Sequence, residues 1–158
     1  MAVVVRAVTE EDLPAACDVM RKSIRALCAK DHNNDEAILS AWLKDKTVDA
    51  LRPHVTSETN LSVVVLRGGI ISGLGLITRN GELCLCYVAP EATGLGCGAA
   101  ILDALERQAT SWGLKRIFLT STVTARGFYE HHGYVPCGKS VVAFGMQEAQ
   151  PMEKAIAL

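Results

Sequence analysis

Three glycines alternate at positions 94, 96 and 98, directly between a run typical of a strand and a run typical of a helix. Glycine lets the backbone turn sharply and lets its N–H groups approach an anion without a side chain in the way. The first turn of the following helix adds unpaired N–H donors and a partial positive charge. One glycine would suit a tight turn alone, but three in alternation favour a loop that binds a phosphate or pyrophosphate.

Two well-known phosphate-binding loops do not fit this segment. A P-loop ends in Gly-Lys-Ser or Gly-Lys-Thr, whereas this loop continues with Ala99 and Ala100. The stretch Gly94 to Ala99 matches the dinucleotide pattern Gly-x-Gly-x-x-Ala, but that fold needs an acid about 20 positions later, at the end of the next strand. The next strand here ends in Thr120 and Ser121. The loop also follows antiparallel strands, so the dinucleotide interpretation fails twice.

The spacing of apolar residues predicts an α/β domain that spans residues 1–158. Gly68-Gly69 and Asn80-Gly81 mark hairpin turns, and the strand–helix–strand unit after residue 82 predicts a parallel pair of strands. The polar stretch 30–34 predicts a break between two helices. The predicted elements are strands at 2–6, 61–66, 70–78, 82–88, 116–121, 134–146 and 152–156, and helices at 10–27, around 38–43, 47–53, 99–112 and 125–132.

Charge and hydropathy exclude several classes of function. Sixteen basic residues stand against seventeen acidic ones, a balance that argues against a nucleic-acid partner because phosphate binding needs an excess of cations. The longest apolar runs, such as 61–66, are far shorter than the roughly 20 residues of a membrane span. The first residues lack the pattern of a secretion signal. We therefore expect a cytoplasmic protein with no membrane partner.

Six cysteines are unusual in a chain of 158 residues. They form no Cys-x-x-Cys pair, and the four histidines show no zinc-site spacing, so we expect no metal. Most of the cysteines lie within apolar runs, where a free thiol behaves as a small buried apolar group. A redox or metal role is the alternative. The cysteines lie at positions 17, 28, 84, 86, 97 and 137.

Two motifs about 30 residues apart resemble those of the GCN5-related N-acetyltransferase (GNAT) family. The first is Tyr87-Val88-Ala89-Pro90 followed by Thr93-Gly94-Leu95-Gly96-Cys97-Gly98, and the second is Ala125-Arg126-Gly127-Phe128-Tyr129-Glu130-His131-His132-Gly133-Tyr134. The order of the predicted elements is similar to the family's as well. The resemblance covers nearly the whole chain and implies the GNAT fold, a mixed and mostly antiparallel sheet of about seven strands with helices on both faces.

The resemblance implies that the first motif holds the pyrophosphate of acetyl-CoA and that the second lies beside its thioester. The chain has Thr93 where the family usually has Gln or Arg, and Leu95 where a basic residue is common. The phosphates should then be held mainly by main-chain donors. The expected cofactor-binding residues are Cys86, Tyr87, Val88, Thr93, Gly94, Leu95, Gly96, Cys97, Gly98, Ala99, Thr122 and Phe128.

Two side chains are candidates for the chemistry. Tyr129 resembles the family tyrosine that protonates the departing thiolate, and its alternative role is that of a core aromatic residue beside Phe128. Glu82 resembles a catalytic base of some members, although an acid next to a turn is often only solvated. Strand alternation puts Glu82, Cys84, Cys86 and Val88 on one face. The backbone N–H near Val88 is implied to polarise the thioester carbonyl.

These observations predict an N-acetyltransferase that moves the acetyl group of acetyl-CoA to a primary amine by direct attack in a ternary complex. The alternative is a non-catalytic acyl-CoA-binding sensor that keeps the cofactor site. The amine acceptor could be a small molecule or a protein, and a homodimer is possible. Asp31 and His32 fall in a region that covers the acceptor pocket in the family, so contact with substrate is a further possibility.

Overall fold

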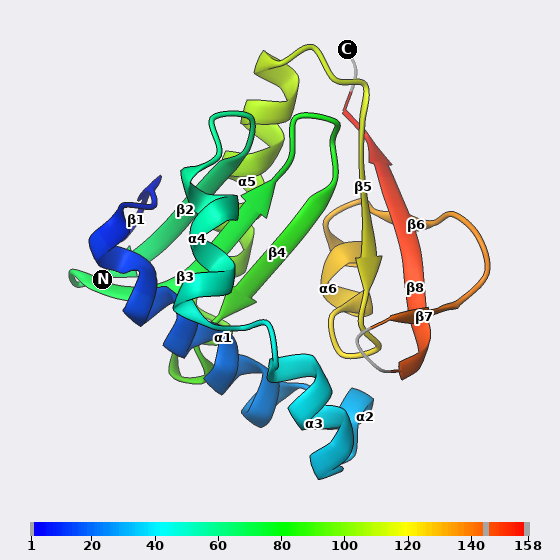
Figure 1. Ribbon diagram of the computed structural model, residues 1–158. Helices are drawn as coiled ribbons and strands as arrows, with labels where there is room; N and C mark the ends of the chain where they lie inside the picture. Colours follow the sequence, from blue (N-terminus) through cyan, green and yellow to red (C-terminus); the bar gives the residue numbers. More distant parts are fainter. Residues whose placement is uncertain (1, 144–145, 157–158) are drawn as a thin grey trace.

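The computed structural model describes residues 2–143 and 146–156 (Figure 1). Short 3-10 turns at Glu10–Asp12 and Pro90–Ala92 precede α1 and α5. The helices are α1 (Leu13–Leu27), α2 (Ala29–His32), α3 (Glu36–Leu43), α4 (Val48–Thr56), α5 (Cys97–Ser111) and α6 (Arg126–His131). The strands are β1 (Val3–Ala7), β2 (Leu61–Arg67), β3 (Ile70–Ile77), β4 (Leu83–Val88), β5 (Arg116–Ser121), β6 (Val135–Pro136), β7 (Val141–Ala143) and β8 (Met146–Ala155).

The first sheet is antiparallel and has the strand order β1-β2-β3-β4. Gly68 and Gly69 both have positive φ in the turn between β2 and β3, the conformation that a two-residue hairpin turn requires. Among the described strands, β1 pairs with β2 alone, so the strand predicted at 2–6 is confirmed and lies at the edge of the sheet.

Helices cover both faces of this sheet. α5 packs on one face, where Ile101 and Leu105 meet Val63 and Val65, and α1 and α4 pack on the other. Gly75 of β3 lies directly under α5, because a Cβ at this position would overlap Ile101. The small residue therefore allows the helix to approach the strand closely.

The second sheet has the strand order β5-β8-β6, with β7 also paired to β8. The predicted single sheet is thus divided, and its two parts meet at one parallel bridge between Glu82 and Phe118. At this bridge the N–H of Phe118 donates to the carbonyl of Gly81 over 3.0 Å. The prediction of parallel neighbours is confirmed here, but β4 and β5 then diverge along their lengths (Figure 1).

Three local predictions differ from the structure. The polar break at 30–34 contains the short helix α2, which Asn33 ends in the left-handed conformation. α4 continues past Pro53 to Thr56, and Thr47 caps it by accepting a hydrogen bond from the Ala50 N–H. The single strand predicted at 134–146 is replaced by the short strands β6 and β7 and the first residue of β8, while its residues 144–145 lie outside the described ranges. Within the described ranges, every helix is too short or too polar to cross a membrane.

Candidate active site

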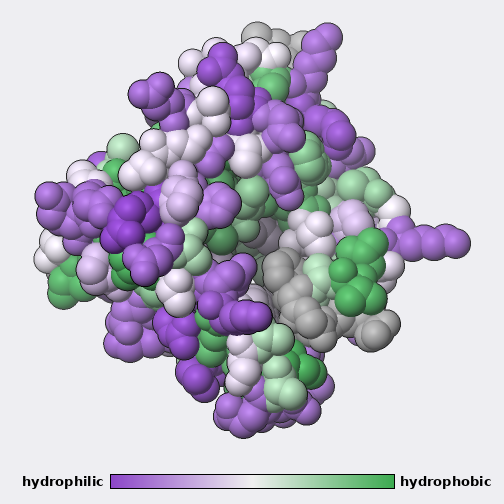
Figure 2. All heavy atoms as spheres, viewed as in Figure 1, coloured by the Kyte–Doolittle hydropathy of each residue, from purple (hydrophilic) through white to green (hydrophobic). Residues whose placement is uncertain are grey.

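A cavity of about 600 Å³ lies where β4 and β5 diverge. Figure 2 shows the surface hollowed between the two sheets. Its walls come from four regions that are distant in the sequence: α1 and α3, β4, the glycine loop with the start of α5, and the segment from Thr120 to α6. All the expected cofactor-binding residues except Leu95 line it, and Tyr129 lines it as well. Leu95 is 48% exposed.

The glycine loop forms one end of the cavity. Gly94 and Gly96 have φ of +78° and +88°, values that L side chains rarely adopt, and Gly96 is the N-cap of α5. The first intrahelical bond of α5 runs from the Ala100 N–H to the Gly96 carbonyl. The N–H groups of the residues between them precede that bond, so they are free to meet an anion at the positive end of the helix.

Gly98 is required for a second reason. A Cβ on Gly98 would lie 2.9 Å from Cε1 of Phe128. Real Cβ atoms do not come this close to another heavy atom, so one of the two groups would have to shift. Phe128 also packs against Tyr129, with ring centroids 5.3 Å apart in an edge-on arrangement. The start of α5 and the middle of α6 are therefore in direct contact, and this contact joins the two sequence motifs.

Tyr129 projects from α6 into the cavity and is only 7% exposed. Its hydroxyl lies near the thiol of Cys86 on β4, and the two groups influence each other's pKa. Burial raises the pKa of Tyr129 well above its usual value, and it raises the pKa of Cys86 to about 12. The phenol is therefore protonated near neutral pH and can donate a proton or a hydrogen bond within the cavity.

The backbone of β4 offers a further donor. The Ala89 N–H donates to the Ser72 carbonyl of β3 over 2.8 Å. Backbone N–H groups alternate in direction along a strand, so the N–H of Val88 points away from β3. It faces the side on which β5 has diverged, and Val88 lines the cavity.

β4 contains a β-bulge that changes which side chains share a face. Leu85 pairs with Leu76 and Leu83 pairs with Ile77, so Cys84 is an extra residue without a partner of its own. Leu83 consequently packs in the same cluster as Cys86 and Val88. The alternation expected from the sequence is wrong at this point.

The bulge also affects Glu82. Leu83 shares a face with Cys86, and neighbouring side chains point to opposite faces, so Glu82 lies on the opposite side of the strand from Cys86. Its side chain is exposed, and it is not among the residues that line the cavity. The structure thus brings Tyr129 and the cofactor-binding residues together but leaves Glu82 at the rim, beside the bridge to Phe118.

Asp31 has a structural role that the sequence did not indicate. Its carboxylate accepts hydrogen bonds from the N–H groups of Val123 and Thr124, over 2.6 and 3.1 Å, and from the Thr124 hydroxyl. These bonds fasten α2 to the loop before α6. His32 is fully buried, and its ring bonds the Ile24 carbonyl and the Asn34 N–H. Neither Asp31 nor His32 lines the cavity.

A family model for the acetyltransferase (GNAT) domain matches residues 28–156, which is most of the chain. The chain belongs to the GNAT family. It is accordingly an N-acetyltransferase, and the family assignment made from the two motifs is confirmed. The GNAT match includes the glycine loop, β4 and α6, which form a large part of the cavity wall.

Solved structures show the same GNAT fold. A GCN5-related N-acetyltransferase from Rhodopseudomonas palustris superposes with a TM-score of 0.88 at 22% identity, over 98% of this chain and 96% of that one. The PaiA N-acetyltransferase from Thermoplasma acidophilum, in complex with coenzyme A, gives 0.86 at 19% identity, over 98% and 99%. The ribosomal-protein-S18-alanine N-acetyltransferase from Escherichia coli gives 0.72 at 17% identity, over 99% and 96%.

The GNAT cavity also has residues that sequence reasoning missed. Four of them come from the N-terminal helices: Ser23 and Leu27 from α1, Cys28 from its end, and Trp42 from α3. His131 and His132 also line the cavity, and the His132 ring packs beside Phe128 with centroids 4.8 Å apart. The apolar spacing of α1 and α3 was visible in the sequence, but nothing in it showed that their ends meet β4.

Proposed function

We propose that this GNAT enzyme transfers the acetyl group of acetyl-CoA directly to a primary amine within a ternary complex. The observation that carries the proposal is the position of Tyr129, whose buried, protonated hydroxyl shares one cavity with the glycine loop. That cavity offers anion-binding N–H groups at one end and an apolar wall at the other, so donor and acceptor can meet between them.

The loop residues would hold the pyrophosphate of acetyl-CoA with main-chain donors. Gly94, Gly96 and Gly98 carry no side chain that would keep a phosphate from the N–H groups at the start of α5. Thr93 adds a hydroxyl donor in place of a cation. The coenzyme A complex of the Thermoplasma relative, which has the same fold, supports this use of the cavity.

The chemistry follows from three groups. The Val88 N–H would stabilise the negative charge that develops on the thioester oxygen as the amine attacks. Tyr129 would then donate its proton to the departing thiolate. Burial raises the pKa of Cys28 and Cys86 to about 12 and that of Cys84 to about 11. These thiols are weak nucleophiles near neutral pH, which favours direct attack over an acyl-cysteine intermediate.

The general base stays a prediction. Glu82 is the candidate from the sequence, but its exposed carboxylate lies outside the cavity lining, so it would act through water. Replacement by Gln tests this role. If Glu82→Gln keeps the wild-type pH profile of kcat/KM, the amine loses its proton to solvent without help from this residue.

The proposed activity is tested by following thiol release from acetyl-CoA with a panel of primary amines, while calorimetry measures acetyl-CoA binding. We expect amine-dependent release of one thiol for each acetylated product. Binding without turnover on any amine would favour the alternative, an acyl-CoA sensor without catalytic activity.

Location and assembly stay proposals. All six cysteines are free, which suits the reducing cytoplasm. For a homodimer, the exposed Val135, Val141 and Val142 on β6 and β7 offer an apolar surface, part of which is seen on the right of Figure 2. Light scattering of the purified protein measures the assembly state directly.

A further inference from the structure

One wall of the cavity, formed by the N-terminal helices and β4, is built from uncharged side chains. Leu27 and Trp42 come from the two N-terminal helices, and Leu83 and Tyr87 come from β4. Trp42 and Leu83 are buried, at 3% and 4% exposed. The ring of Tyr87 packs beside Trp42, away from Cys86 and Val88, so its main chain stays with the expected cofactor-binding residues while its side chain belongs to this wall. Because the glycine loop and α6 would hold acetyl-CoA, this wall is the part of the cavity left for the acceptor.

The acidic side chains near this wall are Asp31, Asp45 and Glu82, and none of the three lines the cavity. Asp31 uses both carboxylate oxygens on Val123 and Thr124. Glu82 is exposed at the rim. Among the residues that the structure describes, those lining the cavity include no Asp or Glu. In the sequence, the positions outside the described ranges carry no acidic side chain either.

The pKa shifts of groups in this wall agree with its lack of charged side chains. Burial is the main cause that raises the pKa of Cys28, Cys84 and Tyr87, three groups on different parts of the wall. Each of these groups is therefore harder to charge than in water. An ammonium group without a paired anion would meet the same unfavourable desolvation there.

We infer that the acceptor is a small primary amine with an apolar body and no second positive charge. This inference rests on the proposed function and specifies its substrate class. The body would pack against Leu27, Trp42 and Tyr87, and the single amino group would point toward Tyr129 and Val88. Linear polyamines and aminoglycosides would be poor acceptors because each would bring a further ammonium group against this wall.

The test compares hexylamine with 1,5-diaminopentane, which have the same number of non-hydrogen atoms and differ by one ammonium group near neutral pH. We expect kcat/KM for hexylamine to be at least about tenfold higher, because the second charge would be buried without a partner. Equal or better turnover of the diamine would overturn the inference. The panel also includes 2-phenylethylamine, spermidine, an aminoglycoside and a peptide with a free N-terminus.

The panel separates failure of the inference from failure of the proposed function. Acetylation of spermidine, the aminoglycoside or the peptide in preference to the two apolar monoamines would leave the enzyme activity standing and overturn the apolar acceptor. Absence of turnover on every amine, with acetyl-CoA still bound, would overturn both.

Two variants of Leu27 test whether this wall causes the preference for hexylamine over the diamine. Leu27→Glu adds a carboxylate to this part of the cavity, and Leu27→Gln is a neutral control of similar size. We expect Leu27→Glu to raise the ratio of diamine to hexylamine kcat/KM at least about fivefold over the ratio for Leu27→Gln. If the two variants give the same ratio, the acceptor does not bind against Leu27 and the inference fails.

Discussion

At the scale of single residues, Tyr129 and Tyr134 form a natural comparison. The two rings pack edge-on with centroids 5.6 Å apart, and both are buried. The Tyr134 hydroxyl donates to Glu106 over 2.9 Å, whereas the Tyr129 hydroxyl meets Cys86 in the cavity. Two neighbouring phenols thus have different partners, one structural and one in the proposed site.

Replacing Tyr129 by Phe should lower kcat about 100-fold or more, because the departing thiolate loses its proton donor. Acetyl-CoA affinity should stay within about twofold of wild type, since the ring is retained. Steady-state kinetics and calorimetry measure the two quantities. Tyr134→Phe is the matched control and should keep its turnover; unchanged turnover in Tyr129→Phe would make Tyr129 a packing residue.

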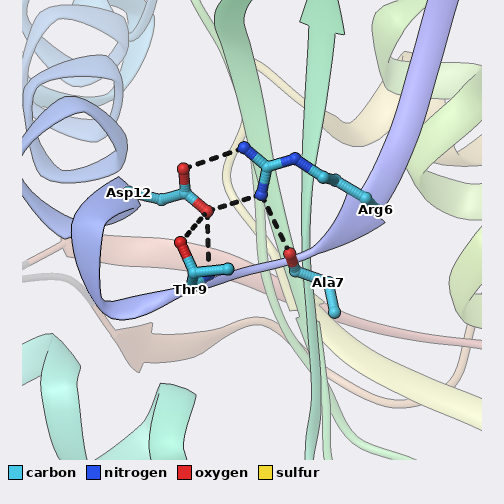
Figure 3. A network of polar contacts seen from close by, with 4 residues as sticks. All are labelled: Arg6, Ala7, Thr9 and Asp12. Carbon is cyan, nitrogen blue, oxygen red and sulfur yellow. Dashed lines mark hydrogen bonds and ion pairs between the residues drawn. The ribbon is translucent and has the colours of Figure 1, made fainter.

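Asp12 joins β1 to the start of α1 (Figure 3). Its carboxylate accepts two hydrogen bonds from Arg6, over 2.6 and 3.0 Å, and two from the backbone and hydroxyl of Thr9. The Arg6 guanidinium is the main cause that holds the pKa of Asp12 far below its usual value. The charged form is therefore favoured in the folded state.

Asp12→Asn should lower the free energy of unfolding at pH 7 by about 1–3 kcal/mol, because it removes charge-assisted hydrogen bonds from a buried group. Because folding lowers the pKa of Asp12, its carboxylate stabilises the folded state at pH values above the unfolded-state pKa of about 3.9. This stabilisation is lost as the pH falls below that value. The difference between wild type and variant should therefore narrow below about pH 4 in urea unfolding. Asp18→Asn, in an exposed pair with Lys22, should change stability little at either pH.

At the scale of the elements, the glycine loop determines where α5 begins. Gly96→Ala places a Cβ in a left-handed conformation, which costs about 1–2 kcal/mol and disfavours the loop geometry. We expect the Kd for acetyl-CoA to rise about fivefold or more, measured by calorimetry. Gly127→Ala is the control: a Cβ on this helical glycine of α6 meets nothing within 4 Å, and its φ is not positive. Equal affinities of the two variants would show that the loop conformation does not govern binding.

The elements differ in how far the sequence predicts them. β5 has the predicted bounds, and α5 is recognised from its strong helical period, because both signals are local. The bulge at Cys84 was not foreseeable, since an apolar run with an extra residue has the same alternation as one without it. α2 was missed because its four residues carry no apolar period.

At the scale of the whole molecule, two sheets meet at one bridge. Gly81 lies at this bridge with φ of +97°, and a Cβ there would come within 2.9 Å of the Arg116 carbonyl. Gly113 also has a positive φ, +78°, but its Cβ would meet nothing within 4 Å. Both glycines therefore have a positive φ that disfavours a Cβ, but only at Gly81 would the added Cβ also clash with a strand of the other sheet.

Gly81→Ala should lower the free energy of unfolding by at least about 1 kcal/mol more than Gly113→Ala, because only the first substitution forces the two sheets apart. Urea unfolding of both variants measures the difference. Similar losses in the two variants would mean that the bridge contributes little to the joining of the sheets.

The cofactor-binding part of the cavity could be predicted from the sequence more fully than the acceptor wall. The cofactor end comes from short contiguous motifs, so its residues could be named from the sequence. The acceptor wall combines Leu27, Trp42 and Tyr87, which lie on three elements. Their meeting depends on how α1 and α3 pack beside β4, and the docking of α2 by Asp31 onto Thr124 has no local signal.

The extra residue in β4 has a consequence for the length of the chain. Because Cys84 is the residue in excess, a strand without it would be a regular ladder in which Leu83, Cys86 and Val88 still share one face. The face of Glu82 would not change either, and only the local bend and extra twist of the bulge would be lost. Homologues that share this cavity should therefore tolerate substitutions at position 84, and also the loss of that residue, while one residue more or less elsewhere in β4 would turn its cavity face away.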